Sequence, residues 1–88
     1  MNVFDKLKAQ LELLEWPNLY LYKFIIPNEN EKLAQVTALF DYETAEISYQ
    51  QSGKGNYVSI SVKEVAVSVD QIIEKYQKAS EIKGVISL

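Results

Sequence analysis

The segment Ser52-Gly53-Lys54-Gly55 comes nearest to a phosphate-binding motif in this 88-residue chain. A Walker-type phosphate loop ends in Gly-Lys-Ser or Gly-Lys-Thr and opens directly into a helix. Here Asn56 follows the glycines, and the chain then alternates between apolar and polar residues, which is the pattern of a strand. The segment therefore predicts a hairpin turn rather than a phosphate site, with Lys54 exposed at its tip.

Two pairs of carboxylates have the short spacing that acid–base catalysis or metal binding uses: Glu29 with Glu31, and Asp70 with Glu74. Each pair lies on the charged side of a segment with helical periodicity, where carboxylates are usually solvated. Glu29 and Glu31 also argue against an anion site at the start of their segment, because they already supply negative charge there. We therefore predict no catalytic residues.

The composition excludes the commonest catalytic and metal-binding chemistries. The chain has no Cys and no His, so the usual ligands of zinc, copper and iron–sulfur clusters are missing. Cys–His and Ser–His–Asp catalysis are impossible within it. We expect no metal and no cofactor.

The charge and the aromatic pattern argue against nucleic-acid binding. The formal net charge is −3, whereas nucleic-acid-binding domains normally carry a basic surface. Ser59 and Ser61 follow Tyr57 where an RNA-recognition motif needs further aromatic residues to stack on bases. We expect no nucleic-acid partner.

The chain shows no signal for membrane association. It contains no apolar run long enough to cross a bilayer, and residues 1–6 lack the basic-then-apolar pattern of a signal peptide. We expect no membrane partner and a cytoplasmic location.

The elements that must position these residues begin with the two strands around the glycine turn. Residues 45–51 and 57–63 both alternate between apolar and polar side chains, which predicts a β-hairpin with one apolar face. Helices are expected to cover that face. Its apolar residues are Ala45, Ile47, Tyr49, Val58, Ile60 and Val62.

Residues 1–16 are predicted to form an amphipathic helix. Asn2 is the expected N-cap, and Trp16-Pro17 is expected to end the helix because a residue before proline avoids the helical conformation. The apolar stripe packs on the core of the chain itself in one interpretation, and on a partner or a second copy in the other. The stripe consists of Phe4, Leu7, Leu11 and Leu14.

Residues 19–88 have the expected order strand, helix, strand, strand, helix, strand. The first strand, residues 19–27, is apolar almost throughout, which predicts a central position in the sheet. Asn28 and Ser68 are the expected N-caps of the two helices, since each has Glu or Gln three residues later, as in a capping box. A short strand over residues 85–88 closes the chain.

This order predicts an α+β fold of the ferredoxin-like β-α-β-β-α-β type in a single domain, with a helix over residues 1–16 and a core over residues 19–88. The core is a four-stranded antiparallel sheet with two helices on one face. The N-terminal helix is expected to lie over part of the other, open face. The candidate interaction residues on that face are Lys23, Ser48, Gln50, Lys54, Tyr57, Ser59 and Ser61.

The turn Ser52-Gly53-Lys54-Gly55-Asn56-Tyr57 resembles the Ser-x-Lys-Gly-Asn-Tyr hallmark of the YbeD-like family of small bacterial proteins, with Gly53 at the variable position. The resemblance extends to Leu14-Glu15-Trp16-Pro17 and Tyr22-Lys23-Phe24, and so covers nearly the whole chain. It implies an ACT-like fold, similar to the regulatory domains of amino-acid-metabolism enzymes, and a label as a lipoate-linked regulatory protein. It brings no functional residues with it. Residues 27–30 lack the glycine that ACT ligand loops typically carry, which argues against an amino-acid carboxylate there.

We interpret the chain as a non-catalytic regulatory or protein-interaction domain whose protein partner is unknown. The alternative is an ACT-like sensor of a small ligand, either an amino acid or lipoate. An enzyme is the least favoured interpretation. The sequence also allows a homodimer, because unpaired sheet edges can pair with another chain.

Overall fold

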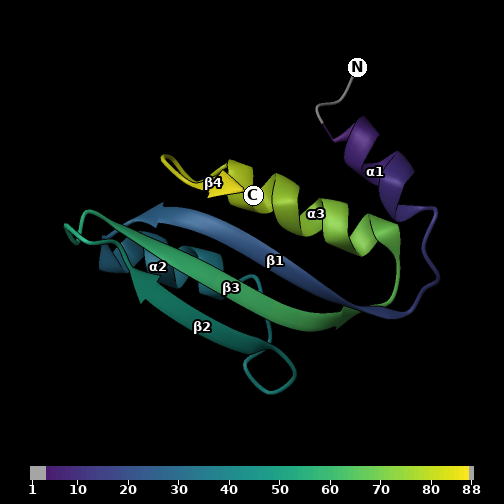
Figure 1. Ribbon diagram of the computed structural model, residues 1–88, viewed down its shortest axis with the longest axis horizontal. Coiled ribbons are helices and arrows are strands. Elements are labelled where there is room, and N and C mark those ends of the chain that lie inside the picture. The colour runs from purple at the N-terminus through teal and green to yellow at the C-terminus, as the bar shows by residue number, and fades with distance from the viewer. Residues whose placement is uncertain (1–3, 88) are drawn as a thin grey trace.

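The computed structural model describes residues 4–87 as a four-stranded antiparallel sheet and three helices (Figure 1). The strand order is β2-β3-β1-β4, with β1 and β3 in the centre. This arrangement confirms the predicted ferredoxin-like α+β fold. The elements are α1 (Asp5–Leu11), β1 (Asn18–Pro27), α2 (Asn30–Thr37), β2 (Glu46–Gln51), β3 (Tyr57–Ala66), α3 (Val69–Ser80) and β4 (Ile86–Ser87).

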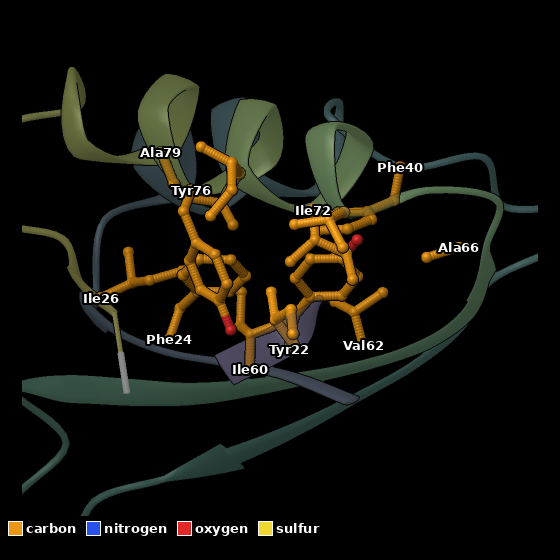
Figure 2. Packing of buried hydrophobic residues seen from close by; sticks show 14 of the residues in the cluster. Tyr22, Phe24, Ile26, Phe40, Ile60, Val62, Ala66, Ile72, Tyr76 and Ala79 are labelled. Carbon is orange, nitrogen blue, oxygen red and sulfur yellow. The ribbon is translucent and has the colours of Figure 1, made fainter. Parts of the chain in front are cut away.

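The core lies between the central strands and the helices. β1 and β3 pair over ten residues each, and alternate residues of both strands point toward α3. Figure 2 shows these side chains interleaved with Ile72, Tyr76 and Ala79 of α3, which are all buried. Full burial of one such side chain contributes about 1.5–3 kcal/mol. The largest fully buried side chains are Tyr22, Phe24, Ile26, Ile60, Ile72, Val36 and Val62.

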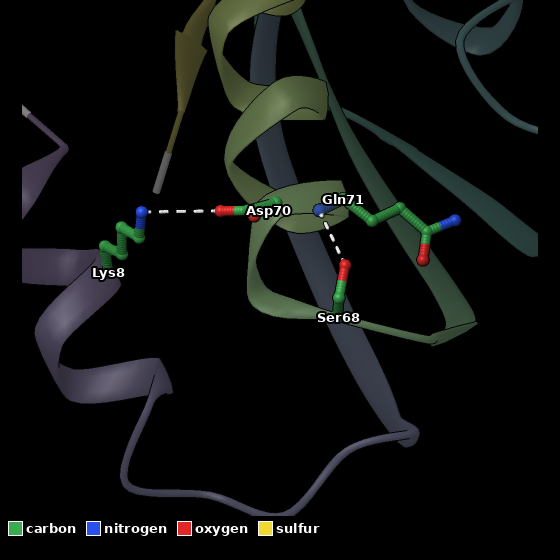
Figure 3. A network of polar contacts seen from close by, with 4 residues as sticks. All are labelled: Lys8, Ser68, Asp70 and Gln71. Carbon is green, nitrogen blue, oxygen red and sulfur yellow. Dashed lines mark hydrogen bonds and ion pairs between the residues drawn. The ribbon is translucent and has the colours of Figure 1, made fainter.

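The N-terminus of α3 carries the predicted cap. Ser68 Oγ accepts a hydrogen bond from the backbone N–H of Gln71 at 3.3 Å (Figure 3). The Gln71 side chain accepts one in return from the N–H of Val67 at 2.7 Å, one residue before the position that a capping box uses. Two amide groups at this helix end are thereby satisfied.

The predicted cap of α2 is wrong. The side chain of Asn28 donates instead to the carbonyl oxygen of Gly55 at 2.8 Å, and so ties the end of β1 to the glycine turn. The N-cap is Glu29, which makes no side-chain capping bond, and the helix itself begins at Asn30. The helix ends at Thr37, and hydrogen-bonded turns follow it.

The first helix is shorter than predicted. α1 ends at Leu11 instead of Trp16. The Trp16 indole N–H donates to the carbonyl oxygen of Leu11 at 2.9 Å, and this carbonyl group at the helix end also accepts from the backbone N–H of Leu14 at 3.1 Å. Leu14, assigned to the apolar stripe, lies beyond this end and is 52% exposed. Asn2, the expected N-cap, lies outside the described residues.

The expectation that the first helix lies over the open face of the sheet is also wrong. α1 packs beside α3 in the helical layer (Figure 1). Leu11 is buried, the rings of Phe4 and Tyr76 stack with their centroids 6.4 Å apart, and Lys8 Nζ lies 3.4 Å from Asp70 Oδ1 (Figure 3). Three residues of the stripe, Phe4, Leu7 and Leu11, therefore pack on the core of the chain itself and extend the cluster around α3, whereas Leu14 does not.

Candidate functional site: the open face of the sheet

The open face consists of the residues that alternate with the core. Odd-numbered residues of β1 and β3 and even-numbered residues of β2 point to this side. None of the helices in residues 4–87 covers it, since α2 and α3 pack on the opposite face and α1 packs on α3 (Figure 1). The placement of α1 thus leaves a complete sheet surface accessible.

Five of the predicted interaction residues lie in two adjacent rows across this face. Lys23, Ser61 and Ser48 are cross-strand neighbours in the first row. Ser59 and Gln50 are neighbours in the second. Side chains in adjacent rows on one face are close enough to contact the same ligand or partner. We call these five residues the polar centre.

The other two predicted residues lie at the glycine-turn end of the sheet. Tyr57 is the first residue of β3, lies opposite Pro27 and is 48% exposed. Lys54 is exposed in the turn between β2 and β3, at the end of the face rather than within it. Gly55 in this turn has φ +73°, a conformation that glycine adopts readily, so the predicted hairpin turn is confirmed.

Four exposed apolar residues of the open face were not predicted from the sequence. Leu19, Leu21 and Val65 lie together at one end and are 56%, 46% and 56% exposed. Ile86 is 52% exposed near the other end, where it pairs with β1. The alternation of β1 was the signal that places its leucines on this face. Exposed apolar side chains gathered on one surface mark interaction sites.

A shallow hollow of about 200 Å³ interrupts the face beside the polar centre. It is lined by Leu21, Glu46, Ser48, Ser61 and Lys63. In the strand register Glu46 lies opposite Lys63, and the two serines lie opposite each other. The hollow thus combines a carboxylate, an ammonium group and two hydroxyls, although ligand pockets are usually larger, at about 300–1,000 Å³.

The charge of the open face is opposite to that of the whole chain. The strand residues that point to this face and the hairpin turn carry Lys23, Lys63 and Lys54 against Glu46 alone, an excess of two positive charges. The chain as a whole carries −3. The remaining surface is therefore acidic, and the open face is electrostatically suited to an acidic partner.

The described part of the chain offers little else that resembles a reactive site. No group of three or more His, Cys, Asp or Glu within residues 4–87 is arranged to hold a metal ion. Within the same residues, no helix has the length and apolar character needed to cross a membrane. A cleft of about 770 Å³ lies between α2 and the end of α3 and is lined by lysines, glutamates, Leu39 and Ile82, among others.

The buried ionisable side chains form a separate cluster on the helical side. Glu64 is 8% exposed, and its carboxylate accepts a hydrogen bond from Thr44 at 3.4 Å. Burial, and then the charge of Glu64, raise the pKa of Tyr22 far above its ordinary value of 10. Burial, and then the hydrogen bond between the Tyr76 and Tyr20 hydroxyls at 3.0 Å, raise the pKa of Tyr76 in the same direction. Tyr22 and Tyr76 are thus held neutral.

Comparison with known proteins gives a family but no activity. A family model described as "Protein of unknown function (DUF493)" matches residues 11–88. The chain belongs to this family. A UPF0250 protein of Haemophilus ducreyi is 29% identical over 89 residues, which cover 97% of this chain and 92% of the relative. These matches confirm the resemblance to a family of small bacterial proteins of unknown function.

One solved structure supports the fold. The uncharacterized protein TM1266 from Thermotoga maritima superposes with a TM-score of 0.67 at 18% sequence identity. The match covers 81% of this chain and 91% of that one. It shows that the two chains share the same architecture.

Proposed function

We propose that this member of the DUF493 family is a non-catalytic regulatory module that binds a partner protein through the open face of its sheet. One observation carries the proposal: this face is uncovered and yet displays Leu19, Leu21 and Val65 at about half exposure. Burying the rest of each of these side chains would contribute about 1 kcal/mol. The polar centre beside them supplies hydrogen-bonding groups that would give such a contact specificity.

A second function is favoured by the hollow beside the polar centre. Lys63 and the two serine hydroxyls complement a carboxylate, and Glu46 complements an ammonium group. An amino acid carries both groups, and lipoate carries the carboxylate. In this alternative the domain is an ACT-like sensor of such a small ligand. A saturable thermal stabilisation by the ligand that Lys63→Ala abolishes would support it.

The protein-binding proposal is tested by capture from the cell extract with the wild-type chain and three variants. Leu21→Glu and Ser48→Glu each introduce a charge on the open face, on different strands. Leu13→Glu is the matched control, because Leu13 is 86% exposed and lies in the α1–β1 connection. Circular dichroism first establishes that all three variants are folded.

We expect a specific protein to bind the wild type and Leu13→Glu but neither open-face variant. In a titration of the two purified proteins, the partner should likewise bind the wild type and Leu13→Glu but neither open-face variant. Equal binding to all versions would show that the open face is not the contact surface.

A further inference from the structure

A cavity of about 460 Å³ lies between the end of β3, the start of α3 and the loop that joins α2 to β2. Its volume is within the range of small-molecule sites, about 300–1,000 Å³. β2 pairs with β3 only as far as Lys63, so the last residues of β3 border the cavity on that side. The cavity is lined by Asp41, Thr44, Glu64, Val65, Gln71 and Lys75.

The cavity lies away from both ends of the described chain. Figure 3 shows the side chain of Gln71 on the side of α3 remote from Lys8 of α1. Phe4, the first described residue, stacks on Tyr76, and Ser87, the last, belongs to β4 on the other side of β1. The lining thus consists of internal segments of the chain.

Glu64 brings a buried carboxylate to the wall of this cavity. It lies between Val62 and Ala66 in the row of β3 that faces the helices, and it is 8% exposed. Its Oε2 atom accepts one long hydrogen bond, at 3.4 Å, from the hydroxyl of Thr44. Its Oε1 atom has no hydrogen-bond partner among residues 4–87. Because burial removes the water that solvates a carboxylate, buried carboxylates are normally paired with a cation or with several donors. Glu64 therefore lacks donors.

The unpaired oxygen of Glu64 is open to the cavity. Within residues 4–87, Tyr22 Oη is the one fully enclosed side-chain oxygen or nitrogen that has no partner. Since Oε1 of Glu64 also lacks a partner, this atom is not fully enclosed, and Glu64 lines the cavity. A group that enters the cavity can therefore donate a hydrogen bond to it.

The charge of the lining favours a singly charged cation. Asp41 and Glu64 stand against Lys75, which gives a net charge of −1. Lys75 Nζ donates to the carbonyl oxygen of Leu39 and lies 5.1 Å from the centre of the Phe40 ring, and it forms no ion pair with either carboxylate. The two carboxylates disfavour an anion. They are also too few for a divalent ion such as Ca²⁺, which takes about six to eight oxygen ligands.

We propose that this cavity binds a small primary alkylammonium ion, whose N–H groups donate to Glu64 and Asp41 and whose short aliphatic chain lies against Val65. The inference goes beyond the function proposed above, because the site is separate from the open face and requires no partner protein. One positive charge neutralises the lining. Charge-assisted hydrogen bonds of this kind are about twice as strong as those between neutral groups.

The lining offers an acceptor for each of the three N–H groups of a primary ammonium. Oε1 of Glu64 is the first. The hydroxyl of Thr44 donates its hydrogen to Glu64 and so keeps its lone pairs for a ligand. Oδ1 of Asp41 accepts from the backbone N–H of Glu43 at 2.8 Å, which leaves the other carboxylate oxygen of Asp41 as the third acceptor. A quaternary ammonium ion has the same charge but no N–H group, so it should bind poorly.

The test is an amide NMR titration of the labelled full chain with butylammonium chloride at constant ionic strength. Tetramethylammonium chloride supplies the charge without N–H groups, and n-butanol supplies the aliphatic chain without the charge. We expect saturable shifts at Thr44, Val65 and Gln71 with butylammonium alone. Butylammonium should also raise Tm in a saturable manner, since a ligand that binds the folded chain stabilises it.

Two variants of equal charge change assign the site. Glu64→Gln should weaken butylammonium binding about ten-fold or more, whereas Glu43→Gln should leave it unchanged, because Glu43 is in the same loop as Asp41 but does not line the cavity. Without ligand, Glu64→Gln should have a Tm equal to or above that of the wild type, because it removes a buried charge that lacks a partner. Asp41→Asn, at an exposed position, is the second binding variant and should weaken binding by a smaller factor.

Other results overturn the inference. Equal shifts with tetramethylammonium or n-butanol would show that the N–H groups are not recognised, and an absence of saturable shifts would show that no such site exists. A lower Tm of unliganded Glu64→Gln would show that Glu64 is a structural residue with a favourable partner. Shifts confined to Glu46, Ser48 and Lys63 would place the amine in the hollow of the open face and reject the cavity. None of these results bears on partner capture by the open face, which Leu21→Glu and Ser48→Glu test separately.

Discussion

The hydroxyl of Tyr22 gives the sharpest test of the packing described above. Tyr22 is fully buried, and its Oη atom has no hydrogen-bond partner among residues 4–87. A buried polar group without a partner costs about 1–3 kcal/mol of folding free energy. Tyr22→Phe removes that cost and loses only the contacts of one atom. We therefore expect the variant to be more stable than the wild type by about 1 kcal/mol.

Tyr76→Phe is the matched control, because it removes the same atom from the same cluster. The Tyr76 hydroxyl lies 3.0 Å from that of Tyr20, so this variant breaks a hydrogen bond and leaves the Tyr20 hydroxyl unpaired. It should lose about 1 kcal/mol of stability. The two variants should thus differ by about 2 kcal/mol, although each loses a single oxygen.

Urea unfolding followed by far-ultraviolet circular dichroism measures the difference. The urea midpoint should rise in Tyr22→Phe and fall in Tyr76→Phe with the slope m unchanged, which identifies a change in stability alone. A change of 1 kcal/mol corresponds to about 4–8 °C in Tm for a domain of this size. The reasoning is refuted if Tyr22→Phe is destabilised as much as Tyr76→Phe, because the hydroxyl of Tyr22 would then have a favourable partner.

Three further predictions concern local structure and pH. Ser68→Ala should cost about 0.5–2 kcal/mol in the same urea assay, because it removes the α3 cap; an unchanged midpoint would show that the cap contributes nothing. Gly84→Ala should lower Tm, since Gly84 has φ +87° and an added Cβ would lie 2.8 Å from the ring of the proline that ends β1. Gly53→Ala, with nothing within 4 Å of its added Cβ, should leave Tm nearly unchanged, and equal effects at the two glycines would contradict this account. The raised pKa values of Tyr22 and Tyr76 mean that the unfolded chain loses these protons first, so the unfolding free energy should fall as pH rises above about 10, by up to about 1.4 kcal/mol per pH unit for each tyrosine. Phenylalanine at either position should reduce that slope, and a flat profile between pH 9 and 11.5 would argue against the burial of both hydroxyls.

The central part of the fold was predictable because its signals are local. The alternation of Val58, Ile60 and Val62 identifies a strand with one buried face, and the structure buries all three. Ser68 and Gln71 identify the start of α3. This signal is also local, because an N-cap depends on residues only three positions apart. These elements, in their order, are enough to specify the ferredoxin-like arrangement.

The features that define the candidate site depend on contacts between distant residues. An apolar stripe containing Leu11 shows that α1 has a buried side but not which surface covers it. The side chain of Asn28 looked like a helix cap, and only the β1–β3 register brings it to Gly55, 27 residues away. The exposure of Leu19 and Leu21 follows from the absence of α1 over the sheet, so the composition of the open face could not be completed before the helix was placed.

The most direct test of the central proposal is amide NMR mapping of the labelled chain with the captured and purified partner. The account predicts that the largest saturable shifts lie at Lys23, Ser48 and Ser59, with smaller changes in the helical layer. Shifts centred on Gln35 and Lys78, which line the cleft between α2 and α3, would show that the helical side is the binding surface and would contradict the account.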